Sequence, residues 1–94
     1  MFIGTCLITL HIPFAGTLKE KRSIVKSIIA RVRNEFNVSV AEVDMHDIYS
    51  QTVIGVASVS TSQNYIHGQL EKVVQFIEKI RPDTPIVDYQ IEIL

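Results

Sequence analysis

Hydrophobic and polar residues alternate along the first twelve positions of the chain, which is the period of a β-strand with one apolar face. Pro13 and Gly16 end the pattern, so the sequence predicts a strand over residues 2–12. One side of it carries Phe2, Gly4, Cys6, Ile8, Leu10 and Ile12, and the other, mixed side carries Ile3, Thr5, Leu7, Thr9 and His11.

The spacing changes to three and four residues in two later segments, which predicts two amphipathic helices. The first begins after Thr17, which with Glu20 forms a capping-box pattern, and runs to about residue 35. The second begins between residues 60 and 64, and residues 81–85 end it. Its apolar face consists of Ile66, Leu70, Val73, Val74 and Ile77.

Three further segments have the composition of strands. Residues 38–45 are double-faced, and the pattern leaves open which alternate set faces the core. Residues 52–60 are rich in β-branched residues, with Gly55 and Ala57 permitting a close helix approach. Residues 86–94 alternate again. A loose hairpin through residues 46–49 joins the first two, because no Asn-Gly or Asp-Gly turn is present.

The order strand, helix, strand, strand, helix, strand is that of the split β-α-β arrangement. We therefore expect one α+β domain over residues 1–94 with the ferredoxin-like βαββαβ fold. Two right-handed crossovers place both helices on one face of a four-stranded antiparallel sheet and leave the other face open.

Composition favours a soluble, cytoplasmic protein. The chain has 94 residues, 47% hydrophobic and 20% charged, with a formal net charge of −1. The single cysteine, Cys6, cannot form an intrachain disulfide, which suits a reducing compartment. The apolar N-terminus has no preceding Lys or Arg and alternates like a strand, and no segment is apolar enough for a membrane span.

Positive charge is concentrated in the first predicted helix. Six of the nine Lys and Arg residues lie between residues 19 and 33. At about 100° per residue, four of them fall within about 60° of one another and form a basic stripe that could follow a run of phosphates. A solvated helix face explains such a run equally well. The stripe consists of Lys19, Arg22, Lys26 and Arg33.

The open sheet face offers a second candidate surface. The strand phases predict that Leu7, Ile54 and Val56 form an apolar patch there, flanked by Thr9, Ser58 and Gln90. Such a patch suggests a homodimer or a protein- or small-ligand-binding module, although scattered exposed aliphatic residues are common on any sheet. No aromatic residue is expected on this face, which disfavours base stacking of the kind seen in RNA-recognition motifs.

Catalytic, cofactor and metal chemistry have little support. Glu42, Asp44 and His46 alternate along one strand and could meet a metal, but charges on a solvated edge strand explain them without one. The Gly16–Lys19 segment lacks the second glycine and Lys-Ser/Thr pair of a P-loop. Cys6 falls on an apolar strand face, where thiols are inert. We expect no cofactor, no metal site and no enzymatic activity.

Residues 18–23 (Leu-Lys-Glu-Lys-Arg-Ser) and 36–43 together resemble the bacterial YlxP-like family of unknown function, and residues 54–60 also match. Where that family has a Gln-Asp-X-Trp-like run, this chain has residues 46–49, with Tyr49 in place of the tryptophan. The resemblance implies a small ferredoxin-like protein with no established activity, encoded in many bacteria near genes for translation initiation and ribosome maturation factors. It favours RNA or the ribosome as the partner of the basic stripe.

Overall fold

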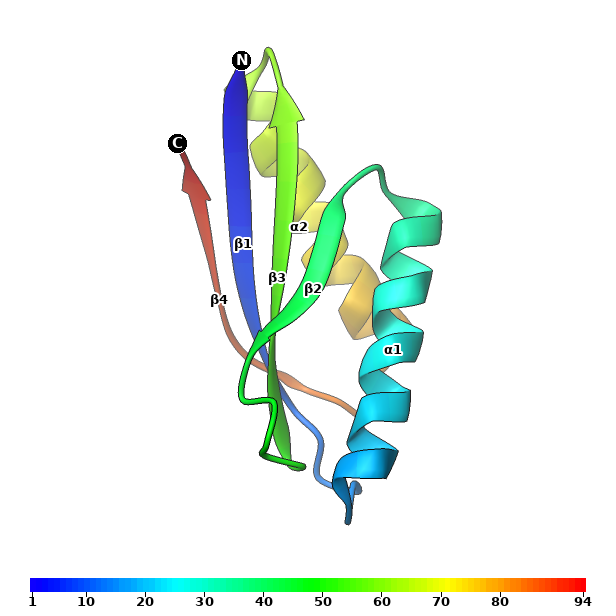
Figure 1. Ribbon diagram of the computed structural model, residues 1–94. Helices are drawn as coiled ribbons and strands as arrows, with labels where there is room; N and C mark the ends of the chain where they lie inside the picture. The colour runs from blue at the N-terminus through cyan, green and yellow to red at the C-terminus, as the bar shows by residue number, and fades with distance from the viewer.

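Six elements follow one another along the chain in the computed structural model, which describes residues 1–94 (Figure 1). The sheet has the strand order β2-β3-β1-β4, and every neighbouring pair is antiparallel. The predicted α+β, ferredoxin-like fold is confirmed. The elements are β1 (Phe2–His11), α1 (Leu18–Glu35), β2 (Ser39–Asp44), β3 (Gln51–Ser60), α2 (Gln63–Ile80) and β4 (Ile86–Ile93).

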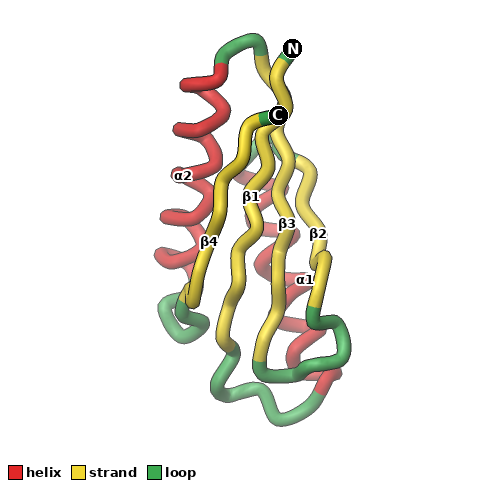
Figure 2. Tube along the Cα trace, turned by 90° about the vertical axis from the view of Figure 1, so that its left-hand side faces the viewer, coloured by secondary structure: helices red, strands yellow, loops and turns green.

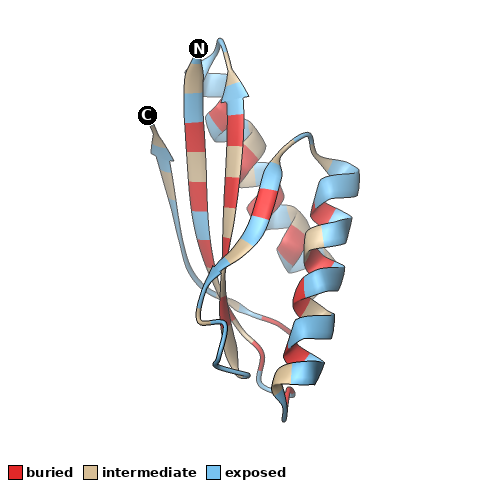
Figure 3. Ribbon diagram, in the orientation of Figure 1, coloured by how far each residue is buried: buried red, intermediate tan, exposed pale blue.

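Both helices cover the same face of the sheet, and Figure 2 shows the opposite face with no helix in front of it. The core fills the space between the two layers. Cys6 and Ile8 of β1 are fully buried there, as are Ile28 of α1 and Leu70 of α2. Buried residues alternate with intermediate or exposed ones along β1 and β3 (Figure 3), because successive side chains of a strand point to opposite faces.

Side-chain caps fix the start of each helix. Thr17 Oγ1 accepts a hydrogen bond from Glu20 N–H at 3.1 Å, and the Glu20 carboxylate accepts one from Gly16 N–H at 3.3 Å. Ser62 caps α2 in the same way, accepting from Tyr65 N–H at 3.2 Å. These bonds satisfy amide groups that have no partner within the helix. The predicted start of α1 after Thr17 is confirmed.

The predicted orientation of β3 is wrong. In an antiparallel pair, residues directly opposite share a face. Val56 lies opposite Cys6 and Ile54 opposite Ile8, so both point into the helix-covered core, where their exposed fractions are 3% and 0%. The prediction that Ile54 and Val56 belong to an open-face patch therefore fails. Leu7, the third member of that set, does lie on the open face and is 49% exposed.

The glycines explain this error. The sequence predicts Gly55 beneath a helix, yet it faces the open side, where Val43 Cγ1 would lie 2.8 Å from an added Cβ. The close helix approach occurs at Gly4 instead, where an added Cβ would overlap Cγ2 of Ile66 on α2. Gly4 therefore sets how near α2 can lie to β1. Gly55 leaves room for the Val43 side chain of β2 to pack against the backbone of β3.

The orientation of β2, which the sequence leaves open, follows from its pairing with β3. Val40 lies opposite Val56 and Glu42 opposite Ile54, so these two side chains share the helix-covered face. The register shifts between Glu42 and Asp44, at the end of the strand. Met45 then turns the chain with a positive φ of 60°, and its N–H donates to the Asp44 carboxylate at 2.7 Å.

Candidate nucleic-acid interface

The basic stripe lies on the solvent-facing side of α1, and its four residues are all exposed. The two ion pairs of the chain are Lys21–Glu42 and Arg81–Asp83, so no carboxylate lies within 4 Å of the charged group of any stripe residue. At a rise of about 1.5 Å per residue, Lys19 and Arg33 are about 21 Å apart along the helix axis. The helix therefore presents a row of cations that no carboxylate of the chain neutralises.

Arg33 differs from the other three stripe residues because it has a partner within the fold. One of its guanidinium nitrogens, Nη2, donates to the Val40 carbonyl oxygen of β2 at 3.1 Å. Lys19, Arg22 and Lys26 make no side-chain hydrogen bond within the chain. Arg31 is also exposed, but it lies about 120° around the helix from Lys19 and therefore outside the stripe.

Lys21, one of the six Lys and Arg residues between residues 19 and 33, is fully buried. Its ammonium group lies 2.9 Å from Glu42 Oε2 and also donates to the Met45 carbonyl oxygen. Thr52 completes the group by donating its hydroxyl to the same carboxylate oxygen at 2.5 Å. The two contacts of Lys21 tie α1 to the end of β2 and to the turn that follows it, and the hydrogen bond of Thr52 adds β3 to the group.

Glu42 keeps its negative charge within this group. Burial alone would raise the pKa of Glu42, but the hydrogen bonds from Thr52 and Lys21 and the positive charge of Lys21 outweigh it and lower that pKa below its ordinary value of 4.5. Glu42 is therefore a structural ion-pair partner. No group of three His, Cys, Asp or Glu side chains in the chain is placed so that it could hold a metal ion.

Replacing Glu42 by glutamine is expected to lower the free energy of unfolding by about 2 kcal/mol at neutral pH. The pKa of Glu42 is lower in the folded protein than its ordinary value of 4.5. The Glu42 carboxylate therefore stabilises the fold fully above pH 4.5, and this stabilisation is lost as the pH falls through the lowered pKa. The difference between the wild type and Glu42→Gln should therefore shrink on acidification. Urea denaturation of both proteins between neutral and acidic pH measures it, and a constant difference contradicts the ion pair.

Cys6 offers no nucleophile. Burial, with a smaller effect from the charge of Glu71, raises the pKa of the Cys6 thiol to about 11, so the thiolate is scarce at neutral pH. Tyr89 donates its hydroxyl to Glu71 at 3.0 Å, and this hydrogen bond raises the pKa of Tyr89. Neither group is poised for proton transfer at neutral pH.

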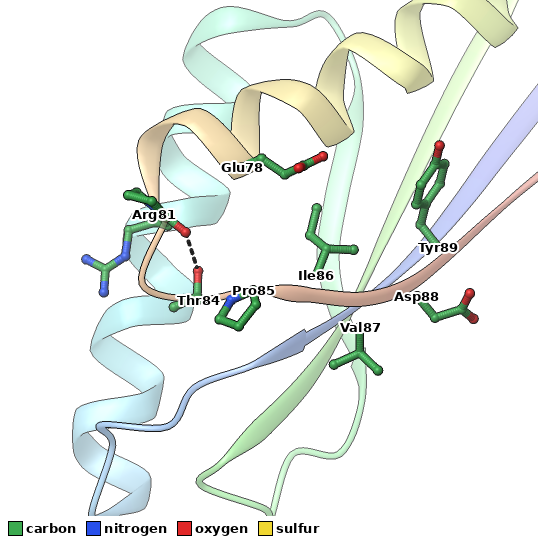
Figure 4. Close-up of a pocket in the computed structure, with 9 residues that line it drawn as sticks. Glu78, Arg81, Thr84, Pro85, Ile86, Val87, Asp88 and Tyr89 are labelled. Atoms are coloured by element: carbon green, nitrogen blue, oxygen red, sulfur yellow. Dashed lines mark hydrogen bonds between the residues drawn. The ribbon is translucent and has the colours of Figure 1, made fainter.

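The largest surface hollow, of about 610 Å³, lies where α2 ends and β4 begins (Figure 4). Its wall carries both signs of charge, with Glu78 and Asp88 against Arg81. The Arg81 guanidinium points away from Tyr89 in Figure 4 and is already paired with Asp83 at 3.0 Å. No convergent set of polar groups, the usual mark of a small-molecule site, lines this hollow.

Solved structures with the same architecture include the de novo designed protein LFR1 1 with ferredoxin fold, with a TM-score of 0.55 and 14% identity over 100% of this chain and 83% of that one. The VAO-type flavoprotein MtVAO615 from Myceliophthora thermophila C1 has a TM-score of 0.58 and 8% identity, over 99% of this chain but only 16% of the flavoprotein. Identities this low establish the ferredoxin-like fold alone.

Sequence comparison identifies the family of the chain. Residues 3–91 match the family described as "Protein of unknown function (DUF503)", and the chain belongs to this family. It is 44% identical over 64 residues to "Uncharacterized protein YlxP" of Bacillus subtilis (strain 168), an alignment that covers 68% of this chain and 70% of that protein. The resemblance to YlxP-like proteins is confirmed. Neither helix has the length and apolar character that crossing a membrane requires.

Proposed function

We propose that this protein is a non-enzymatic, cytoplasmic accessory protein that binds RNA or the ribosome through the basic stripe on α1. The observation that carries the proposal is the row of exposed cations without carboxylate partners, on a chain whose net charge is −1. A negatively charged chain gains nothing from its overall field in binding RNA, so attachment depends on this local concentration of charge.

The chemistry of the stripe suits phosphate contact. Each Lys or Arg that neutralises a phosphate releases condensed counterions, which makes affinity depend steeply on salt. Base reading would need aromatic or hydrogen-bonding groups beside the cations. The two aromatic residues of the strands, Phe2 and Tyr89, share the register of the helix-covered face and are not available for stacking on the open sheet. Binding through the stripe is therefore expected to be largely independent of RNA sequence.

Replacing Lys19, Arg22 and Lys26 together with glutamine tests the proposal. Arg33 is left in place because it holds β2. Glutamine retains helix propensity, and the three exposed side chains make no hydrogen bond or ion pair within the chain, so the fold should persist. The slope of log affinity against log salt for a fluorescein-labelled RNA hairpin should become shallower by about two to three, as measured by fluorescence anisotropy.

The matched control is the triple glutamine variant of Arg31, Lys72 and Lys79. These residues are also exposed and lie outside the stripe, and their replacement removes the same charge. The control should retain most of the wild-type slope. If the slope fell equally in the two variants, RNA binding would depend only on net charge. If the slope of the stripe variant were unchanged, the stripe would be an ordinary solvated helix face. Either result contradicts the proposal.

A further inference from the structure

The two edges of the sheet differ in how well they are protected against pairing with another strand. An edge strand carries unpaired backbone N–H and C=O groups, which short length, bulges, proline, lysine or a covering helix keep from pairing. At one edge, β2 is six residues long, its register shifts between Glu42 and Asp44, and the Arg33 guanidinium donates to the Val40 carbonyl oxygen. Figure 1 shows α1 beside this strand, whereas β4 is the outermost element at the opposite edge. The β2 edge is therefore protected by the chain itself.

The β4 edge lacks these protections over residues 88–93. This part of the strand contains no proline, lysine or arginine, and the register shift of the β1–β4 pair lies before it. The N–H of Leu94 donates to the Ile3 carbonyl oxygen of β1 at 2.7 Å. Because alternate residues of an antiparallel strand bond to the same neighbour, the even-numbered residues from 94 back to 88 face β1. The residues between them direct their backbone N–H and C=O groups away from the sheet, and they are Tyr89, Ile91 and Ile93.

These outward-directed groups can pair with the same groups of a second copy. Two identical strand edges related by a two-fold axis run antiparallel. With the axis at Ile91, the two copies of Ile91 face each other, and Tyr89 of each copy faces Ile93 of the other. Each of these facing pairs exchanges both of its backbone hydrogen bonds. The edge is therefore complementary to itself in backbone hydrogen bonding.

The charged side chains of the strand select this position of the axis. Asp88, Gln90 and Glu92 lie on the open face, opposite residues of β1 that also face it. With the axis at Ile91, Glu92 lies opposite the uncharged Gln90 of the second copy, and the two Glu92 side chains are only diagonal neighbours at about 7–8 Å. An axis one residue away on either side would set Glu92 directly against Glu92 or against Asp88. Like charges directly opposite each other are destabilising, so the pairing centred on Ile91 is favoured.

Apolar side chains extend the contact on the helix-covered side of the strand. Tyr89, Ile91 and Ile93 lie opposite β1 residues that face the helices, and Ile91 and Ile93 pack against the margin of the core. Tyr89 is still 39% exposed in the single chain. Across the axis, Ile91 meets its own copy and Tyr89 meets Ile93, and aromatic–β-branched pairs of this kind stabilise a sheet. The pairing therefore continues the apolar row of β4 into the second copy.

We infer that the protein forms a homodimer in which β4 of one copy pairs with β4 of the other, antiparallel and centred on Ile91, so that one continuous sheet runs through both copies. The basic stripe lies on α1, which packs against β2 rather than β4. The stripe of each copy therefore stays exposed, far from the two-fold axis. The dimer goes beyond the proposed RNA binding and does not depend on it.

Sedimentation equilibrium of the wild type and of two variants at Gln90, in the absence of RNA, tests the register. The wild type should sediment as a dimer. Gln90→Lys sets an opposite charge against Glu92 of the second copy and should lower the dissociation constant by about fivefold, whereas Gln90→Glu sets a like charge there and should raise it by about fivefold. Gln90 is exposed, so both variants should fold. The matched controls Ala41→Lys and Ala41→Glu add the same charges at an exposed residue of β2 and should leave the dimer unchanged.

Amide hydrogen exchange followed by NMR tests which edge pairs. At a concentration where the protein is dimeric, the N–H groups of Tyr89, Ile91 and Ile93 should exchange as slowly as those of Gln90 and Glu92, which bond to β1. A wild type that stays monomeric would overturn the dimer. A dimer in which the three outward N–H groups exchange far faster than those of Gln90 and Glu92 would overturn pairing through β4. If Gln90→Lys dimerised no more tightly than Gln90→Glu, the register centred on Ile91 would be wrong.

Discussion

Replacing Lys21 by alanine is expected to lower the free energy of unfolding by about 3 kcal/mol. The side chain is fully buried, and it is the partner of both the Glu42 carboxylate and the Met45 carbonyl oxygen. Its loss leaves the largely buried Glu42 carboxylate without a counter-charge and the Met45 carbonyl without a hydrogen-bond donor. Both groups remain desolvated without a partner, which destabilises the folded state. Urea denaturation followed by circular dichroism measures the change.

Two further variants separate the ion pair from the loss of a side chain. Lys26→Ala removes an exposed lysine from the same helix and should change stability by less than about 0.5 kcal/mol. The double variant Lys21→Met/Glu42→Gln removes both charges and should be more stable than Lys21→Ala, since no unpaired buried charge remains. If Lys21→Ala were as stable as Lys26→Ala, the buried ion pair would be contradicted.

Replacing Gly4 by alanine is expected to destabilise the protein by about 2 kcal/mol. The new Cβ would overlap Ile66 Cγ2 and would lie 3.2 Å from a methyl carbon of Leu70. Both neighbours are fully buried, so α2 or β1 must shift to make room. The thermal midpoint of Gly4→Ala should therefore fall well below that of the wild type.

Gly68→Ala is the matched change at a position without this constraint. Gly68 lies on the exposed side of α2, and no heavy atom lies within 4 Å of the added Cβ. Alanine is favoured over glycine inside a helix by about 1 kcal/mol, so this variant should be more stable than the wild type. Stabilisation of both variants would show that β1 and α2 are not in close contact at Gly4.

The elements and their order could be predicted from the sequence because local periodicity determines them. The apolar stripe of α2 and the capping box of α1 are both found where the sequence predicts them. The orientation of β3 could not be obtained in this way, since apolar residues occur on both of its faces and its glycine was assigned to the wrong side. Pairing with β1 decides the matter, because Val56 must share a face with Cys6, which is buried.

The role of Lys21 was missed although a signal for it exists. Lys21 lies four residues before Val25 and seven before Ile28, and therefore on the buried side of the helix rather than in the basic stripe. A lysine in that position needs a buried partner, and the double-faced segment containing Glu42 supplies one. The six cations of α1 thus differ in position, because Lys21 is buried and holds the fold, whereas the four stripe residues and Arg31 face solvent.

The most direct test of the stripe is an NMR titration of isotopically labelled protein with an RNA hairpin at low salt. We expect the largest chemical-shift changes at the backbone and side chains of Lys19, Arg22, Lys26 and Arg33, with little change at Leu7 and Val43 on the open face. Shifts confined to the open face, or spread evenly over the surface, would contradict the assignment of RNA binding to this helix.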